Sequence, residues 1–501
     1  MNGEQVLFCE IQNGLAPVFY PKHLSSLKYP NDIAKKYFSA IIESEYFALG
    51  KGEMMMKTIH VDFSSACGPI KPMNAVNNGP TGMSERGTSN FLDYKALEIP
   101  YARNHDASFC PGYGGEHTVD VHRIFRNFDA DENDPASYIF EPTDMYTRNT
   151  YAAGTKVFYR LGASIEHGYK FGTYPPRDYA KWARICEHII RHYNEGWANG
   201  FHYGIEYWEI WNEPDCRNGD GSNPCWQGTM QDFIELYDVA ANHLKKCFPN
   251  IKIGGPAFTS PFLNEDREAF MVAVGERKMP MDFYSFHRYT KKPEGIAAAI
   301  REAKATVERL GLGAPELILN EWNYIKGWME EDWNYSLRME TSLKGASFIA
   351  GSMFMGQASV LDMLMYYDAR PCGMCGLFDT DSLARRKGYY VFEQFKELRR
   401  LGTAADVCAQ TENIYACAAT DGKNGAVMLT HFDDVDEAPA EDVCLVIKGL
   451  GEEKAIRAQF YLLDETSDNT LVREEILTAK EFSIYLSMKL FDTCLIRFTE
   501  I

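Results

Sequence analysis

Two segments of the chain each end an apolar run with an Asn-Glu pair, and their carboxylates are candidates for acid and base chemistry. The first segment is 207–215, which contains Glu213, and the second is 317–323, which contains Glu321. Two carboxylates that face each other suit glycoside hydrolysis, because one can protonate the leaving oxygen while the other attacks the anomeric carbon. The acid must stay protonated near neutral pH while its partner is ionised, so the two groups need different surroundings.

Glu213 lies between an apolar strand-like run and a proline. Pro214 cannot extend the hydrogen-bond ladder of a strand, and a residue before proline favours extended backbone, so we expect Glu213 to be extended. In a barrel of parallel strands the active residues lie at the carboxyl ends of the strands, where this segment would place Glu213. Glu209, on the same strand face, is predicted to form a buried structural ion pair.

The pattern between residue 69 and about residue 400 predicts a parallel (β/α)8 barrel. Apolar strand-like runs alternate with helical segments such as 176–193 and 231–247, and a closed barrel of this type requires eight strands. Glu213 and Glu321 are 108 residues apart, or three repeats of 36, which places them after the fourth and seventh strands. His287 then ends the sixth strand. The eight candidate strands are 70–77, 99–105, 155–162, 205–212, 251–254, 282–288, 317–321 and 360–366.

The remainder of the chain divides into a second domain and an extension. After Leu401, short apolar runs separated by turn residues predict an antiparallel β-sandwich, with strands at 413–420, 425–432, 442–448, 456–463, 482–487 and 493–499. The predicted boundaries are an N-terminal extension of unknown role at 1–53, the catalytic barrel at 54–400 and the sandwich at 401–501. The first strand of the barrel range is a candidate to pair with the sandwich.

Several motifs together carry a resemblance to a known family. The sequence Trp-Asn-Glu-Pro at 211–214, with Asn320 and Glu321, resembles the clan A retaining glycoside hydrolases. Further motifs are similar to those of glycoside hydrolase family 39, the β-xylosidase and α-L-iduronidase family. These motifs are 68–79 (GPIKPMNAVNNG), 101–105 (YARNH), 254–256 (GGP), 285–289 (SFHRY) and 463–465 (LDE), so the resemblance extends from about residue 59 to the end of the chain.

The resemblance implies roles for particular residues. Glu213 would be the general acid/base and Glu321 the nucleophile of a retaining double displacement. Asn212 would hydrogen-bond the sugar 2-hydroxyl. The remaining substrate-binding candidates are His287 and Tyr289 near the nucleophile, Arg103 and His105 at the second-strand edge, and Trp322, whose ring could stack on a sugar. A retaining pair requires carboxyl groups about 5–5.5 Å apart, whereas an inverting pair lies about 6.5–9.5 Å apart.

Composition and charge exclude several other classes of protein. The chain has 501 residues and a formal net charge of −19, which repels nucleic acid and anionic membrane surfaces. It contains no apolar run long enough to cross a membrane, and its first residues lack the basic region of a secretory signal. Thirteen cysteines without a regular framework favour reduced thiols. We therefore expect a cytoplasmic protein; a homo-oligomer is left open.

No cofactor or metal is predicted. Cys372 and Cys375 form a CxxC pair that lacks a second ligand pair, and the five-residue offset between His117 and His122 fits neither a strand nor a helix ligand pattern. No function is assigned to either pair.

The prediction is an exo-acting β-glycosidase of β-xylosidase type that acts on a small oligosaccharide or glycoside. Three alternatives differ in class. The first is another glycosidase specificity, namely β-glucosidase, β-galactosidase, α-L-arabinosidase or an α-L-iduronidase-like enzyme, and the last would need a cationic clamp for the sugar carboxylate. The second is a non-catalytic carbohydrate-binding barrel, which would have no reason to retain both glutamates. The third is a metal-dependent hydrolase, which would be sensitive to chelators.

Overall fold

The computed structural model describes residues 56–82, 89–106, 117–166, 169–409, 411–450 and 454–501. The extension predicted at 1–53 lies outside these ranges.

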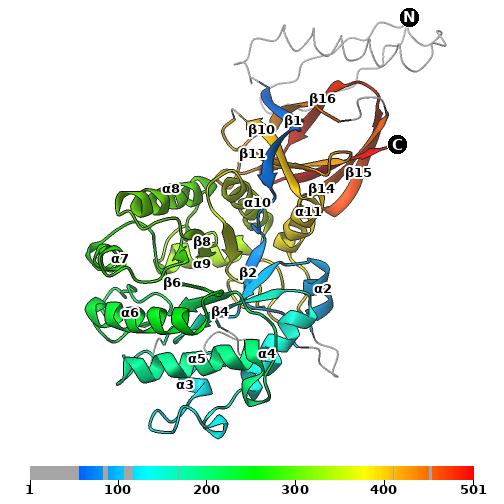
Figure 1. The fold of residues 1–501 in the computed structure, drawn as a ribbon. Helices are drawn as coiled ribbons and strands as arrows, with labels where there is room; N and C mark the ends of the chain where they lie inside the picture. Colours follow the sequence, from blue (N-terminus) through cyan, green and yellow to red (C-terminus); the bar gives the residue numbers. More distant parts are fainter. Residues whose placement is uncertain (1–55, 83–88, 107–116, 167–168, 410, 451–453) are drawn as a thin grey trace, which may run out of the picture. The chain divides into compact units, whose positions relative to one another are not determined.

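Eight parallel strands close into a barrel, as predicted (Figure 1). Every candidate range from the sequence contains or overlaps one of them, and β5, β7 and β8 end at or just before the predicted site residues. In order around the barrel, the strands are β2 (Ala75–Asn77), β3 (Tyr101–Arg103), β4 (Lys156–Leu161), β5 (Tyr207–Ile210), β6 (Lys252–Phe258), β7 (Phe283–His287), β8 (Glu316–Glu321) and β9 (Met363–Tyr366).

Helices connect the strands and cover the outside of the barrel. The two predicted helices correspond to α5 (Tyr179–Glu195) and α6 (Met230–Cys247). Asp178 caps the first turn of α5, and Thr229 forms a capping box with Asp232 at the start of α6. The other helices are α2 (Phe91–Ala96), α3 (Val121–Ile124), α4 (Glu141–Ala152), α7 (Glu265–Arg277), α8 (Pro293–Arg309), α9 (Glu330–Glu340), α10 (Leu343–Gln357) and α11 (Lys387–Leu401), with short 3-10 turns at Pro135–Ser137 and Trp197–Asn199.

The interior of the barrel changes from apolar to polar along the strands. A cluster of buried residues at or near the amino-terminal ends contains Phe158, Tyr207, Phe283 and Ile318 among others. Phe158 and Tyr207 stack with ring centroids 5.3 Å apart. This apolar floor fills the closed end of the barrel, so the polar side chains that follow on the same strands gather at the carboxyl ends.

The second domain is one hydrogen-bonded sheet of nine strands in the order β15-β14-β17-β12-β11-β10-β1-β13-β16. Its pairs are antiparallel except for the parallel pair β1–β13. All six predicted strands are present, and β10 and β15 are additional. The strands are β1 (Lys57–Pro69), β10 (Thr403–Ala409), β11 (Ile414–Thr420), β12 (Gly425–His431), β13 (Glu441–Lys448), β14 (Ile456–Leu463), β15 (Asp468–Leu477), β16 (Glu481–Met488) and β17 (Thr493–Glu500).

This sheet folds over so that its two halves pack face to face. Phe482 on β16 and Phe498 on β17 are distant in the strand order, yet their ring centroids are 5.9 Å apart. Phe63 on β1 lies at the same distance from Phe498. The domain therefore packs as a sandwich although its strands form a single sheet.

Strand β1 brings the first described residues into the sheet domain. Ile59, Val61 and Phe63 are buried and alternate with more exposed residues, the pattern of a half-buried strand. β1 pairs with β10 on one side and with β13 on the other. The first strand of the predicted barrel range thus lies in the sheet domain, because the apolar face of the sheet needs this strand to bridge β10 and β13.

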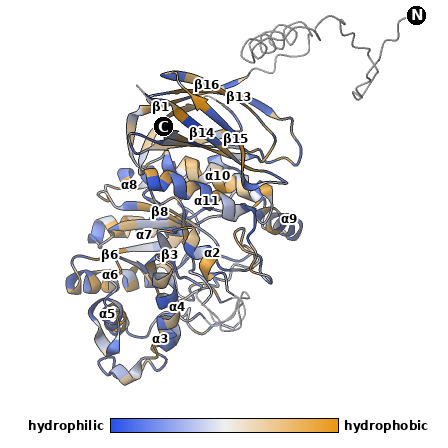
Figure 2. Cartoon of the chain, turned by 90° about the vertical axis from the view of Figure 1, so that its right-hand side faces the viewer, coloured by the Kyte–Doolittle hydropathy of each residue, from blue (hydrophilic) through white to orange (hydrophobic). Residues whose placement is uncertain are grey.

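Helices α10 and α11 lie between the barrel and the sheet (Figure 2). Nearly every residue of α10 is buried, since it has neighbours on both sides. The Ser347 hydroxyl donates a 2.8 Å hydrogen bond to the carbonyl of His431, and the Tyr324 hydroxyl donates one of 2.6 Å to Asp434. Within the described part of the chain, no helix is both long and apolar enough to cross a bilayer.

Removal of the buried β1 side chain tests this role of the strand. We expect Ile59→Ala to lower the free energy of unfolding by about 2–5 kcal/mol, because Ile59 is fully buried between the halves of the sheet. Thr58→Ala, on the exposed face of the same strand, should change it by less than about 0.5 kcal/mol. Urea denaturation compares the two variants, and equal effects would contradict the packing of β1 in this core.

Candidate active site

The backbone at the end of β5 is bent rather than extended. Trp211 and Glu213 have φ angles of 76° and 48°, in the left-handed region, so the prediction that Pro214 keeps Glu213 extended is wrong. Such conformations cost about 1–3 kcal/mol each and persist where the surroundings enforce them. Here the Trp211 amide donates to the Leu161 carbonyl (2.8 Å) and the Glu213 amide donates to the Ala257 carbonyl (3.0 Å). These bonds to neighbouring strands outweigh the local preference and turn Glu213 toward the barrel axis.

Gly162, which follows β4, leaves space for the Trp211 ring at this bend. Gly162 follows β4 with a φ of 111°, and a Cβ on it would lie 2.6 Å from the Trp211 ring. The indole Nε1 of Trp211 donates to the Cys225 carbonyl at 2.9 Å. The ring is thus held on both sides, and it anchors the residue two positions before Glu213.

Glu213 lies at the mouth of the barrel with its carboxyl group mostly buried. Nδ1 of His287, at the end of β7, is 2.8 Å from Oε1 of Glu213. The Cys225 thiol contacts Oε2 at 3.8 Å. The side chain remains 15% exposed, so a ligand in the barrel mouth can reach the carboxyl group.

Glu321, at the end of β8, faces the same histidine. Its Oε2 is 3.4 Å from Nδ1 of His287 and accepts a 2.9 Å hydrogen bond from the Tyr289 hydroxyl. Its Oε1 accepts a 2.7 Å bond from Nη1 of Arg103. One side-chain atom of each of Glu213, His287 and Glu321 lies within 4.8 Å of the other two. Three residues from the fifth, seventh and eighth strands of the chain therefore converge on one point.

Arg103 is fully buried below this point, and it binds residues of β5, of the segment after β5 and of β8. Its Nε donates to Glu209 at 2.7 Å, and its Nη2 donates to the side-chain oxygen of Asn212 at 2.7 Å. Glu209 also accepts from the Ser285 hydroxyl at 2.7 Å. The predicted structural ion pair of Glu209 is confirmed, with Arg103 as its partner. This fork of donors holds Asn212 and Glu321 in fixed positions relative to each other.

Burial and nearby charges give the two carboxyl groups unequal acidity. Burial raises the pKa of Glu213 to about 8, and the carboxylate of Asp215 acts in the same direction. Burial also raises the pKa of Glu321, but only to about 7, because His287 and the Arg103 cation oppose the effect. Burial lowers the pKa of His287. Near neutral pH the favoured state is therefore a protonated Glu213 beside an ionised Glu321.

His105 lies at the edge of β3, near the nucleophile candidate but not in direct hydrogen bond with it. Its Nε2 is 3.7 Å from Oε1 of Glu321, and its Nδ1 accepts a 3.1 Å bond from Nε of Arg160. Burial lowers the pKa of His105 well below its usual value. The ring is therefore neutral, and it forms part of the pocket wall between β3 and β4.

The segment after β9 contributes residues that the sequence reasoning missed. Asp368 and Arg370 are buried and 3.4 Å apart, and Nη1 of Arg370 donates to the Asp106 carbonyl at 2.9 Å. The Tyr367 hydroxyl donates to Asp106 at 2.5 Å. Their position after the eighth predicted strand, which matches that of Glu213 after the fourth, could have indicated them. Their local sequence gives no further indication, because it resembles an ordinary polar loop.

Trp322 does not belong to this cluster. Its ring is fully buried against Phe348 of α10 and Tyr366 of β9, since the residue after Glu321 points away from the barrel axis. This position argues against the predicted contact of Trp322 with substrate. The exposed Trp328 lies on the mouth instead, 64% accessible and 5.4 Å from the ring of Tyr289.

Side-chain atoms of the site are also potential metal ligands. Glu213, His287 and Glu321 could each offer one ligand atom, as could Glu213, Cys216 and Cys225. The Arg103 cation, 2.7 Å from Glu321, is fully buried, so solvent does not screen its repulsion of a divalent ion at the first group. His117 and His122 do not converge: His117 faces Asp120 at 4.0 Å, while the His122 ring packs against Phe171.

Comparison with known proteins identifies relatives of the barrel. Residues 124–318 match the sequence model of the glycosyl hydrolases family 39, a segment that includes Glu213 and ends just before Glu321. A β-xylosidase of Geobacillus stearothermophilus is 27% identical over 218 residues, which are 40% of this chain and 40% of the relative. A β-xylosidase of Caldicellulosiruptor saccharolyticus is 29% identical over 161 residues, 32% of this chain and 29% of the relative. The matches thus span well under two thirds of these curated relatives.

The fold itself has close counterparts among solved structures. A glucosidase from Croceicoccus marinus superposes with a TM-score of 0.72 at 19% identity, covering 89% of this chain and all of that one. The likeness covers both the barrel and the sheet domain. At this identity it concerns the architecture alone.

Loss of the Arg103 charge tests the electrostatics of the site. We expect Arg103→Met to lower the free energy of unfolding by about 3–5 kcal/mol at neutral pH, because Glu209 and Glu321 would be buried without their cation. The variant should also raise the pKa of Glu321. A carboxyl group whose pKa is higher in the folded than in the unfolded state costs stability as pH rises, so the loss should be larger at about pH 8 than at about pH 5.

Thermal denaturation at the two pH values measures this difference. Arg177→Met is the matched control, since Arg177 forms an exposed ion pair with Asp129 and should contribute less than about 1 kcal/mol. A loss in Arg103→Met that does not depend on pH would contradict the proposed influence of the guanidinium on Glu321.

Proposed function

Because residues 124–318 match the sequence model of the glycosyl hydrolases family 39, we propose that the chain is a retaining glycoside hydrolase of this family. The observation that carries the proposal is the pair Glu213 and Glu321, two carboxyl groups on opposite sides of the barrel mouth that contact the same His287 nitrogen at 2.8 and 3.4 Å. The substrate proposed is a small oligosaccharide or glycoside, hydrolysed from its end. Among sugars, β-xylosides are the first choice, since the two sequence relatives described above are β-xylosidases.

The two glutamates take different parts in a double displacement. The Glu321 carboxylate attacks the anomeric carbon while Glu213 gives its proton to the departing oxygen. Glu213 then takes a proton from the water that releases the sugar from Glu321. The order of the pKa values, about 8 for Glu213 and about 7 for Glu321, supports these roles, because the acid must keep its proton when the nucleophile has lost its own.

The spacing of the pair supports retention of configuration. The closest side-chain oxygens of Glu213 and Glu321 lie within 4.8 Å of each other. An inverting pair needs room for a water molecule between its carboxyl groups, which sets them about 6.5–9.5 Å apart. A sugar carbon fits between these oxygens, whereas a sugar and an additional water would not.

Four neighbours would prepare the nucleophile and the sugar. Arg103 and Tyr289 donate to opposite oxygens of Glu321 and orient its carboxylate. Asn212 receives a hydrogen bond from Arg103 on its oxygen, so its amide group is turned to donate to a sugar hydroxyl, for which the 2-hydroxyl is proposed. His287 bridges the two glutamates and would keep them apart from direct contact.

The charge balance of the pocket favours a neutral sugar over a uronic acid. The buried cations Arg103, Arg160 and Arg370 each lie within 3.4 Å of a protein carboxylate. A sugar carboxylate would therefore find its cations already paired, and it would add a charge beside Glu321. This argues against an α-L-iduronidase-like specificity and leaves β-glucosidase, β-galactosidase and α-L-arabinosidase as the alternatives to β-xylosidase.

A panel of nitrophenyl glycosides tests the activity and its stereochemistry. We expect the fastest hydrolysis with the β-D-xyloside, compared with the β-D-glucoside, β-D-galactoside and α-L-arabinoside, and we expect NMR to detect the β-anomer of xylose first. Glu321→Ala should reduce kcat at least about 10⁴-fold, because the covalent step is lost. A first-formed α-anomer would exclude retention, and sugar binding without turnover in the wild type would favour the carbohydrate-binding alternative.

The acid role of Glu213 is tested with leaving groups of different basicity. We expect Glu213→Gln to lose about 10²–10⁴-fold in kcat/KM on a methyl glycoside, but much less on a dinitrophenyl glycoside, whose leaving group needs no proton. The wild-type rate should fall above the pKa of Glu213, about 8, as the acid ionises, and fall below that of Glu321, about 7, as the nucleophile is protonated.

In the Glu213→Gln variant, the fall in rate at alkaline pH should disappear. Glu206→Gln is the control, because Glu206 precedes β5 at the opposite end of the strand and pairs with Lys252 at 2.8 Å. Equal losses on both leaving groups would remove Glu213 from the role of acid.

A further inference from the structure

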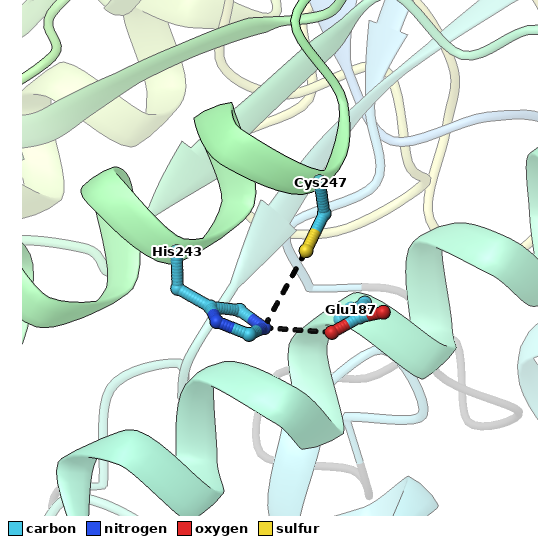
Figure 3. Close-up of side chains that lie close together, drawn as sticks. All are labelled: Glu187, His243 and Cys247. Carbon is cyan, nitrogen blue, oxygen red and sulfur yellow. Dashed lines mark hydrogen bonds and ion pairs between the residues drawn. The ribbon is translucent and has the colours of Figure 1, made fainter.

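Glu187, His243 and Cys247 form a cluster of side chains on helices α5 and α6 (Figure 3). Glu187 comes from the middle of α5, and His243 and Cys247 come from the last turns of α6. Because these helices precede and follow β5, they flank the strand that carries Glu213. No step of the proposed reaction uses these three residues.

The three side chains converge within the reach of one ion. His243 and Cys247 are four residues apart, so they lie on the same face of α6. Nε2 of His243 is 2.7 Å from Oε2 of Glu187 and 3.8 Å from the sulfur of Cys247. All three ligand atoms lie within 4.8 Å of one another. Tetrahedral zinc, with bonds of about 2.0–2.3 Å, holds its ligand atoms about 3.3–3.7 Å apart, so small rotations of these side chains would suffice.

The donor set identifies the class of ion. A thiolate, an imidazole and a carboxylate together suit zinc, whereas magnesium and calcium require mostly oxygen ligands. The side chains of His243 and Glu187 are 29% and 15% exposed, so an ion can enter from solvent and water can occupy the fourth position. Three protein ligands and one water molecule would complete a tetrahedral shell.

A neighbouring arginine orients the carboxylate for this purpose. Arg191, four residues after Glu187 on α5, donates to Oε1 of Glu187 from Nε at 2.9 Å and from Nη2 at 2.7 Å. The other oxygen, Oε2, is left toward His243 and Cys247. Partners of this kind that fix the ligands are typical of metal sites.

We propose that Glu187, His243 and Cys247 bind one Zn²⁺ ion, which joins α5 to α6. Binding replaces the proton shared by His243 and Glu187 and displaces the proton of the Cys247 thiol, so two ligands lose protons to solvent when the ion is bound. The carboxyl end of α6 leads to the start of β6, so the ion lies toward the end of the barrel opposite Glu213. Its effect is on stability and not on the reaction.

Metal titration of the full chain tests the site. Co²⁺ is the spectroscopic probe, because a thiolate ligand produces a sulfur-to-cobalt charge-transfer band. We expect one equivalent of Co²⁺ to produce this band and one equivalent of Zn²⁺ to remove it. Zn²⁺ at about 100-fold excess over its dissociation constant should raise the melting temperature by a few degrees. Cys247→Ser and His243→Gln should each weaken Zn²⁺ binding more than about 100-fold, since even the loss of an outer partner costs 10–100-fold.

Controls separate this cluster from the other thiols. Cys216→Ser removes a ligand from the group around Glu213 and should leave the cobalt band and the zinc-dependent rise in melting temperature unchanged. Cys247→Ser should leave glycoside hydrolysis unchanged, so a failure of this proposal is distinguishable from a failure of the proposed activity. A cobalt band that persists in Cys247→Ser, or that disappears in Cys216→Ser, would overturn the assignment.

Discussion

The buried guanidinium of Arg103 is the interaction on which the site depends. It lies in the barrel axis, above the apolar floor, and bonds to Glu209, Asn212 and Glu321 at 2.7 Å each. A buried cation requires carboxylate partners, and a buried carboxylate requires a cation, so these residues determine one another's positions. Burial opposes the charge of Arg103, but the two glutamates outweigh that effect and raise its pKa.

The carboxyl group of Glu213 differs from that of Glu321 because Arg103 does not contact it. Glu213 has no arginine against its carboxyl group, and burial beside Asp215 raises its pKa more than the pKa of Glu321 is raised. Desolvation thus acts on both glutamates; Asp215 adds to it at Glu213, whereas His287 and Arg103 oppose it at Glu321. The left-handed backbone of Trp211 and Glu213 brings the less compensated carboxyl group to His287.

The sheet domain and the outer helices support the barrel, but they contribute no residue to the site at its mouth. The nine-stranded sheet draws its strands from both ends of the described chain, since β1 pairs with β10 and β13. Helix α10 is buried between this sheet and the barrel, which explains its apolar composition on all sides. The helices α5 and α6 on the other side of the barrel carry polar outer faces, on which the Glu187, His243 and Cys247 cluster lies.

The sequence pattern was sufficient to predict the barrel, its eight strands and the place of the two glutamates at strand ends, because apolar strands ending in Asn-Glu are local patterns with a regular spacing. It also indicated the ion pair of Glu209, since a buried acid needs a partner. The cation that pairs with Glu209, the packing of Trp322 against α10 and the hydrogen bond from Arg370 to the Asp106 carbonyl became visible only in the three-dimensional structure. It also decided the bend at Glu213, where hydrogen bonds to the strands on either side outweigh the preference that Pro214 imposes. These features depend on contacts between separate elements of the fold, and no local pattern encodes such contacts.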